Sequence, residues 1–221
     1  MLNGILVVNK PEGITSHDVV DFVRKKLKIR QVGHTGTLDP IATGVLLVLI
    51  GRCTKLFSHF SDFDKTYSAT LTLGRRTTSG DREGKTVETK DFNHVSQDSV
   101  ERVMCFFRGR GFQVPPMVSA VKHNGKRLYA LARSGIEVAR KARPIKIKEL
   151  KLVEFNPPDI KFYLRCSKGT YVRQLGEDIA RDLDCVGYIS QIRRQSIGPF
   201  NLNQAVSLSK IDESNLRPYP F

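Results

Sequence analysis

The sequence has no tryptophan, three methionines and four cysteines in 221 residues. The cysteines lie 52, 61 and 19 residues apart, at Cys53, Cys105, Cys166 and Cys185, so the close pairs of zinc sites and redox motifs are absent. We therefore expect reduced, mostly buried thiols. The longest apolar run, Val45–Ile50, has six residues, against the roughly 20 needed to cross a bilayer. These absences exclude a disulfide scaffold and a membrane-spanning helix.

The signatures of cofactor-dependent enzymes are also missing. No glycine fingerprint of a dinucleotide-binding fold occurs, and the five histidines lack the His-x-Glu and Cys-x-x-Cys partners of zinc deaminases. The amino end has no basic stretch followed by a long apolar segment, so no secretory signal is expected. We expect a cytoplasmic protein that needs neither metal nor cofactor and does not bind membranes.

Positive charge dominates the composition. Lys and Arg number 36 against 22 Asp and Glu, giving a net charge of +14 and a pI near 9.8, which favours a polyanionic partner. Residues 108–181 hold 17 of these basic residues but only 6 acidic ones. The densest part runs from Lys122 to Lys148 and contains Lys126, Arg127 and Tyr129. It is either a solvated face or a track for phosphates, and the local excess favours the track.

Apolar periodicity predicts alternating strands and helices in an α+β fold, with a mixed, largely antiparallel central sheet and flanking helices. Strict alternation marks the strand Thr66–Leu73, with Tyr67 on its apolar face. Other strands are expected at Gly4–Val8, Val45–Ile50, Ile145–Phe155 and Ile160–Cys166, the last two joined by an Asn-Pro-Pro-Asp turn. Helices are expected after Thr15 and Ser16, after Ser96, and from Tyr171 to Leu183; the first carries an apolar stripe at Val19, Val20, Phe22, Val23 and Leu27.

One carboxylate is framed by small residues. Asp39 lies in Gly33–Pro40, followed by Ala42-Thr43-Gly44, a pattern that predicts a tight, exposed loop leading into the strand Val45–Ile50. Such a loop can hold a catalytic carboxylate at fixed geometry. Taken alone, Asp39 before Pro40 is better explained as a turn cap.

Seven short motifs favour the catalytic role of Asp39 over the turn cap. In chain order they are Asn9–Ser16, Gly33–Gly44, Lys65–Tyr67, Gln113–Ala120, Asn124–Tyr129, Gly169–Arg173 and Ile192–Arg194. Over residues 4–200 the chain resembles the bacterial TruB-type tRNA pseudouridine synthases, which convert the T-loop uridine at position 55 of tRNA to pseudouridine. The resemblance implies a catalytic domain over 1–200 and a short tail over 201–221, too short for a complete RNA-binding PUA module.

The resemblance also implies roles for single residues. Asp39 matches the catalytic aspartate, Tyr67 the tyrosine that stacks on the target base, and Arg173 the arginine that pairs with the catalytic carboxylate. Three further contacts with substrate are implied: His34 would fill the space of the flipped base, Ile192 would line the uracil pocket, and Lys10 matches a basic position on the side of the active site. Lys126 and Arg127, in the basic segment, are expected to contact the RNA phosphates.

Two departures from the family pattern stand out. Thr78 takes the place of the first of two acidic residues, so one acidic contact is expected to be missing, and Tyr188 stands where many members have His. The implied partner is the T-stem-loop of tRNA, with no obligatory protein partner. A non-catalytic tRNA-binding chaperone and a guide-RNA-dependent synthase remain as alternatives; a carboxylate at Asp39 serves catalysis but not simple phosphate binding.

The expected chemistry needs one carboxylate. The bond between uracil N1 and ribose C1′ breaks, the base turns, and C5 is joined to C1′, with Asp39 acting either as a nucleophile or as a stabiliser of positive charge. A dry pocket would raise the pKa of that carboxyl, which the guanidinium of Arg173 would offset.

Overall fold

The computed structural model describes residues 2–119 and 121–219. Ala120 of the Gln113–Ala120 motif and residues 220–221 of the expected tail lie outside them. The chain forms two compact units: unit 1 comprises Met1–Tyr67 and Ile192–Phe221, and unit 2 comprises Ser68–Gln191. Among the described residues, no helix has the length and apolar character required to span a membrane.

Unit 1 is built around a buried central strand, β3 (Thr43–Ile50). Strand β1 (Gly4–Lys10) pairs antiparallel with β3 along its whole length, and β2 (Val32–Thr35) pairs antiparallel with its second half. The end of β12 (Gly187–Ile197) pairs in parallel with its start. The other elements include the helices α1 (Ser16–Leu27) and α2 (Phe57–Ser61) and the short strand β13 (Phe200–Asn201). Short 3-10 turns occupy Gly51–Leu56, Leu202–Gln204, Leu208–Lys210 and Glu213–Asn215.

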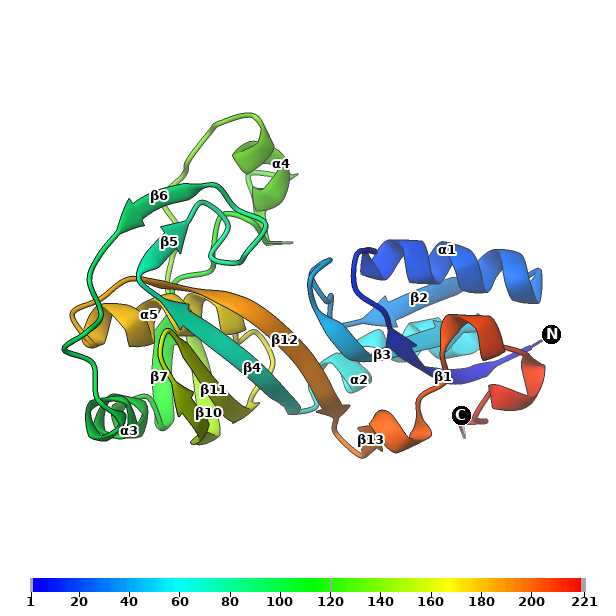
Figure 1. Ribbon diagram of the computed structural model, residues 1–221. Coiled ribbons are helices and arrows are strands. Elements are labelled where there is room, and N and C mark those ends of the chain that lie inside the picture. Colours follow the sequence, from blue (N-terminus) through cyan, green and yellow to red (C-terminus); the bar gives the residue numbers. More distant parts are fainter. Residues whose placement is uncertain (1, 120, 220–221) are drawn as a thin grey trace. The chain divides into compact units, whose positions relative to one another are not determined.

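Helix α1 begins where the sequence predicts. The Thr15 side chain accepts a hydrogen bond from the Asp18 backbone N–H, and the Asp18 carboxylate accepts one from the Thr15 N–H, which forms a capping box. Val19, Val20 and Val23 of the predicted stripe are buried, and Figure 1 shows α1 lying along β2. The expectation for Phe22 is wrong. It is exposed, because its place on the 3.6-residue helix turns it away from the valine face.

Unit 2 contains a second group of strands, in the order β12–β4–β11–β10–β7. The long β10 (Arg143–Asn156) pairs antiparallel with both β11 (Asp159–Cys166) and β7 (Gly109–Gln113), so the predicted hairpin is confirmed. Along β4 (Lys65–Leu73) alternate side chains are buried, as its pattern predicts. Smaller pieces are β5 (Arg75–Thr77), β6 (Thr86–Thr89), β8 (Lys122–His123), β9 (Lys126–Arg127) and α4 (Leu128–Arg133).

Two helices cover strands of unit 2 (Figure 1), which confirms the expected α+β class. Helix α3 (Gln97–Phe106) is capped by Ser96 as predicted and packs on β10. Helix α5 (Val172–Asp182) approaches β12 closely, since a Cβ added at Gly176 would lie 2.7 Å from Ile189 Cδ1. Only glycine therefore fits at this crossing, and the close packing fixes the position of the α5 residues that precede it.

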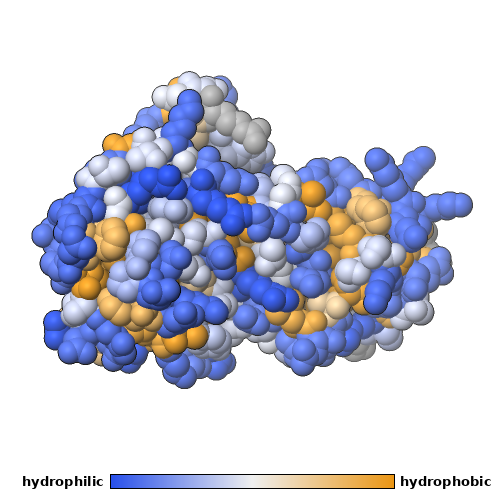
Figure 2. All heavy atoms as spheres, in the orientation of Figure 1, coloured by the Kyte–Doolittle hydropathy of each residue, from blue (hydrophilic) through white to orange (hydrophobic). Residues whose placement is uncertain are grey.

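The described part of the expected tail packs on unit 1. Val206 forms a parallel bridge with Val8 and Arg217 an antiparallel bridge with Ile5, and Ile211 is buried. All four cysteines are free thiols, and three of them are buried, with Cys105 exposed. Figure 2 shows that hydrophilic residues cover most of the visible face of each unit.

Candidate active site

Asp39 lies on a loop of unit 1 between β2 and β3. The loop is shorter than the Gly33–Gly44 pattern predicts, because it begins after Gly33. Gly33 and His34 belong to β2, because their backbones pair with Leu49 and Val48 of β3, and the turn starts only at Gly36, where φ is +69°. This positive φ suits glycine and turns the chain away from the sheet. Asp39 itself is half-buried.

A buried guanidinium holds the start of this loop. Arg194, on β12, is 1% exposed. Its Nη2 donates to the carbonyl oxygen of Gly36 at 2.9 Å, and its Nε to that of Val45 at 2.7 Å. A further, longer bond runs from Nη1 to the oxygen of Thr37 at 3.5 Å. One side chain therefore connects the residues before and after Asp39, and each carbonyl bond to a charged donor is worth more than a neutral one.

A buried ammonium holds the end of the loop. Lys10 is 0% exposed, and its Nζ donates to the carbonyl oxygens of Pro11 at 2.9 Å, Ile14 at 2.7 Å and Pro40 at 3.3 Å. The backbone N–H of Gly13 also donates to the Pro40 oxygen, at 2.9 Å. The Asn9–Ser16 motif is thus a turn whose charge and backbone are both bonded to the residue that follows Asp39.

The residue before Asp39 is fixed by a hydroxyl. Ser16 Oγ accepts from the Leu38 N–H at 2.8 Å and lies 3.1 Å from the Leu38 carbonyl oxygen, to which it donates. The backbone oxygen of Asp39 accepts from the Ala42 N–H at 3.0 Å. Both flanks of the carboxylate are therefore held by buried polar groups, which limits the movement of its backbone.

Three other predicted residues belong to unit 1. Tyr67 on β4 is 7% exposed, so its ring lies mostly within the fold. Ile192 on β12 is buried, and His34 on β2 is half-buried.

Arg173 lies in unit 2, near the start of α5, and is 3% exposed. Its Nη1 lies 3.6 Å from Asp81 Oδ2 and donates to the Ser79 carbonyl oxygen at 2.7 Å. Its Nη2 donates to the Val118 carbonyl oxygen at 2.8 Å. Asp81 is itself buried and fixed, because its Oδ1 accepts from Ser79 Oγ at 2.5 Å and from the Glu83 N–H at 3.1 Å. The guanidinium is therefore oriented by groups of its own unit.

Comparisons with known proteins place this arrangement in a family. The model of the TruB family pseudouridylate synthase N-terminal domain matches residues 24–172, more than half of the chain. A tRNA pseudouridine synthase B of Clostridium kluyveri is 46% identical over 99% of this chain and 75% of its own length. The chain belongs to the TruB family of pseudouridylate synthases.

Other TruB relatives and solved structures agree. A tRNA pseudouridine synthase B of Syntrophotalea carbinolica is 46% identical over 96% of this chain and 69% of its own. Among solved structures, the crystal structure of a Cbf5-Nop10-Gar1 complex matches with a TM-score of 0.73 and 29% identity over 93% of this chain. The match covers 52% of that chain, so this chain spans about half of the structural relative. Members of the family are isomerases that act on RNA.

The remaining predictions for this TruB chain concern two exposed cations and two positions that depart from the family pattern. Lys126 and Arg127 form β9 and are exposed, which leaves their charges accessible. At Tyr188 the ring lies under the Arg75 guanidinium, 4.6 Å from its carbon to the ring centroid, so this departure from the family pattern makes a cation–π contact. Despite the threonine at position 78, Asp81 supplies an acidic partner for Arg173.

Sequence reasoning missed three residues that shape the site. Arg194 belongs to one of the seven motifs but had no predicted role, Ser16 was assigned only to a helix start, and Asp81 had no predicted partner. The signal for Arg194 and Ser16 was their place within two of the seven motifs, and the signal for Asp81 was its place three residues after the altered position Thr78. Their partners are backbone carbonyls or distant side chains, which no local pattern reveals.

Proposed function

We propose that this chain converts the T-loop uridine at position 55 of tRNA to pseudouridine, with Asp39 as the catalytic carboxylate. Membership of the TruB family makes the chain a tRNA pseudouridine synthase, an isomerase. The assignment of Asp39 rests on how its loop is held. The buried cations Arg194 and Lys10 and the buried hydroxyl of Ser16 bond to residues on both sides of Asp39. Enzymes fix reacting groups in this way because a displacement of about 1 Å can cost roughly 100-fold in rate.

Asp39 would act on the ribose. Its carboxylate either attacks C1′ or stabilises the positive charge that develops there as the bond to N1 breaks. The released uracil keeps the bonding electrons, turns in the site, and forms the new bond from C5 to C1′; the C5 proton leaves and N1 takes up a proton. Atoms and electrons balance without water, metal or hydride carrier.

Arg173 and Tyr67 would support this reaction. Arg173 would counter the charge of the Asp39 carboxylate, and Asp81 would hold the guanidinium in orientation. Tyr67 would stack on the extruded uracil; base–aromatic stacking is worth roughly 1–3 kcal/mol, comparable to the few kcal/mol needed to flip a base. His34 would occupy the space left by the base, Ile192 would line the uracil pocket, and Lys10 would lie near the substrate while holding the loop.

The RNA would be held through phosphates. The exposed cations Lys126 and Arg127 would contact the T stem, whose A-form backbone is recognised by shape and charge more than by sequence. We assign catalysis to residues 1–200 and place the reaction in the cytoplasm, with tRNA as the partner.

Tritium release tests the proposal. A tRNA transcript labelled at uridine C5 should lose tritium when this chain is added without cofactor, and Asp39→Asn should reduce release to background while retaining tRNA binding. Release at the parent rate by Asp39→Asn would remove the catalytic assignment. Binding without any release by the parent would instead favour a tRNA chaperone.

Tyr67 provides a second variant. Tyr67→Phe keeps the ring and should bind tRNA like the parent, whereas Tyr67→Leu should lower turnover severely with little change in affinity. A parallel loss of binding and of folded structure in Tyr67→Leu would mark the ring as part of the core only.

A further inference from the structure

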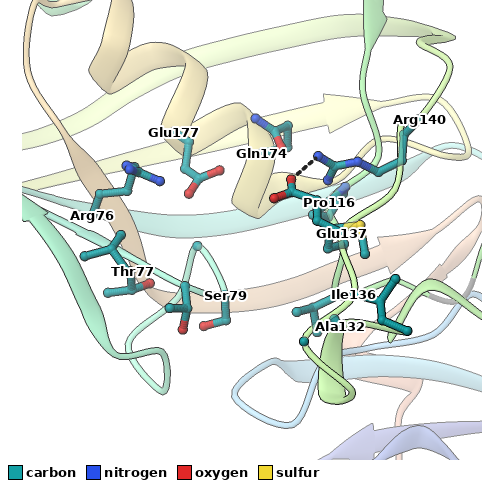
Figure 3. Close-up of a pocket in the computed structure, with 16 residues that line it drawn as sticks. Arg76, Thr77, Ser79, Pro116, Ala132, Ile136, Glu137, Arg140, Gln174 and Glu177 are labelled. Atoms are coloured by element: carbon teal, nitrogen blue, oxygen red, sulfur yellow. Dashed lines mark hydrogen bonds and ion pairs between the residues drawn. The ribbon is translucent and has the colours of Figure 1, made fainter. Parts of the chain in front are cut away.

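Unit 2 contains a cavity beside Arg173 that the proposed chemistry does not use. Its volume is about 490 Å³, within the range of small-ligand sites. Figure 3 shows its wall, to which α5 contributes Gln174 and Glu177, β5 contributes Arg76 and Thr77, and the segment after β7 contributes apolar side chains. The apolar members are Val87 of β6 and, after β7, Pro116, Met117, Val118, Ala132 and Ile136.

The cavity adjoins the guanidinium of Arg173. Two residues whose carbonyl oxygens accept from Arg173, Ser79 and Val118, line the cavity, and Gln174 is the next residue along α5. A ligand in the cavity would therefore lie immediately beside the residue that the proposed function places at the target uridine. The RNA nucleotides nearest that uridine are the groups that the reaction itself brings to this position.

Glu177 gives the cavity its chemistry. Among the described residues its carboxylate makes no hydrogen bond or ion pair, although the side chain is half-buried and lines the cavity. Burial raises the pKa of this carboxyl, and the charge of Arg76 opposes the rise. An ionised carboxylate can only accept hydrogen bonds. The two guanidiniums that also line the cavity are bonded to other groups, Arg76 to Glu88 and Arg140 to Glu137 and the Pro115 carbonyl oxygen. The Glu177 carboxylate is therefore an acceptor in the wall that no described donor occupies.

Gln174 adds a second acceptor on the same face. It lies three residues before Glu177, one turn of α5 away. Its Nε2 donates to Asp178 Oδ1 at 3.2 Å. The amide nitrogen of Gln174 therefore points toward Asp178. The carbonyl oxygen of the amide remains able to accept. An exocyclic amine carries two hydrogens, which match two acceptors, and a carboxylate accepting from the amine of cytosine is an established pairing.

We propose that this cavity binds a nucleobase with an exocyclic amine on its pairing edge, which means cytosine, adenine or guanine and not uracil, from a nucleotide next to the target uridine. The base packs between the apolar side chains, and its amine donates to Glu177 and Gln174. A uracil at the same place presents a carbonyl oxygen to the carboxylate and is rejected. The inference rests on the proposed function, because that function brings RNA to Arg173.

The test measures binding of T-arm hairpins to the whole chain. Each loop cytidine, adenosine or guanosine is replaced in turn by its analogue without the amine, which is the 2-pyrimidinone riboside, the purine riboside or inosine. We expect one position near the target uridine at which loss of the amine weakens binding roughly 5- to 100-fold, the range for a good base contact. Glu177→Met removes the charged acceptor and leaves only the neutral amide oxygen of Gln174, so the same replacement should change the Kd by less than about twofold.

Glu101→Met is the matched control, because Glu101 is an exposed acid on helix α3 and does not line the cavity. It should keep the full dependence on the amine. The proposal is overturned if no position depends on the amine in the parent, or if the dependence persists unchanged in folded Glu177→Met.

Tritium release from the same hairpins separates the two proposals. Release without any dependence on an amine would overturn the inference and leave the proposed function intact. Amine-dependent binding that Glu177→Met abolishes, without release by the parent, would overturn the proposed function and support the base-binding cavity.

Discussion

Arg194 and Gly36 are joined by a hydrogen bond across 158 positions of the chain, in which the arginine Nη2 donates to the glycine carbonyl oxygen at 2.9 Å. The same side chain donates to Val45 beyond the loop. The guanidinium thus connects the two ends of the Asp39 loop, in addition to the turn closed by the hydrogen bond from the Ala42 N–H to the Asp39 carbonyl oxygen. Because the guanidinium is buried, its removal leaves carbonyl oxygens without donors.

Arg194→Met should therefore impair both stability and turnover. Each buried carbonyl left unpaired costs about 1–3 kcal/mol, so the free energy of unfolding in urea should fall by about 2–5 kcal/mol. Turnover of the folded fraction should fall roughly 100-fold, as the loop moves. Arg193→Met, at the exposed neighbouring position, should change stability little. A fully stable and active Arg194→Met would show that the loop holds its own shape.

Asp81→Asn should separate charge from packing. The amide retains an oxygen for Ser79 and Glu83 but removes the negative charge beside Arg173. We expect kcat for uridine isomerisation to fall about 10- to 100-fold while KM changes little, since the guanidinium loses its orientation. Asp81→Glu should restore part of the rate. Asp182→Asn, which changes an exposed acid of the helix that carries Arg173, should behave like the parent, and an equal decrease there would contradict the role of Asp81.

Lys126→Ala with Arg127→Ala should weaken tRNA binding and flatten its dependence on salt. Removing one phosphate interaction reduces the slope of log K against log salt by about 0.9 on a duplex. The matched control is Lys25→Ala with Lys26→Ala, two exposed cations of α1. Equal slopes for both double variants would show that only net charge matters and that β9 does not bind phosphate.

Glu177→Gln should stabilise the chain more at neutral than at acid pH. Burial raises the folded-state pKa of the carboxyl, so the folded state binds more protons than the unfolded state between the two pKa values. The contribution of Glu177 to the free energy of unfolding is complete below the usual pKa of a glutamate. It is lost as pH rises from that value through the raised pKa of the folded state. The Tm gain of the variant should therefore be largest above that value and disappear at low pH. A constant gain from acid to neutral pH would contradict the effect of burial.

The sequence predicted the regular elements well, because local periodicity reports local burial. On β4 the alternation of Tyr67, Ala69, Leu71 and Leu73 with polar residues matches the observed burial residue by residue. The hairpin of β10 and β11 was predicted because its turn signal lies between two apolar patterns. The fold class followed from the same signals.

The site was predicted less completely, because its determinants are long-range. The sequence does not predict strand β2, since four residues that include a glycine carry no period of their own, and pairing with β3 decides their conformation. The burial of Lys10 and Arg194 could not be predicted either, because charged side chains are rarely buried and their carbonyl partners have no sequence signature. The motifs indicated which residues matter, and the structure supplied what they bond to.

Unit 1 is assembled from two stretches separated by the whole of unit 2. During synthesis, Asp39 leaves the ribosome long before Arg194, one of the side chains that hold its loop. Unit 2, a single continuous stretch, can order first. The bonds from Arg194 to the Asp39 loop must then wait for the stretch that follows unit 2, and contacts of such long sequence separation form slowly. The order of translation thereby makes the final fixing of the Asp39 loop a later event than the synthesis of unit 2.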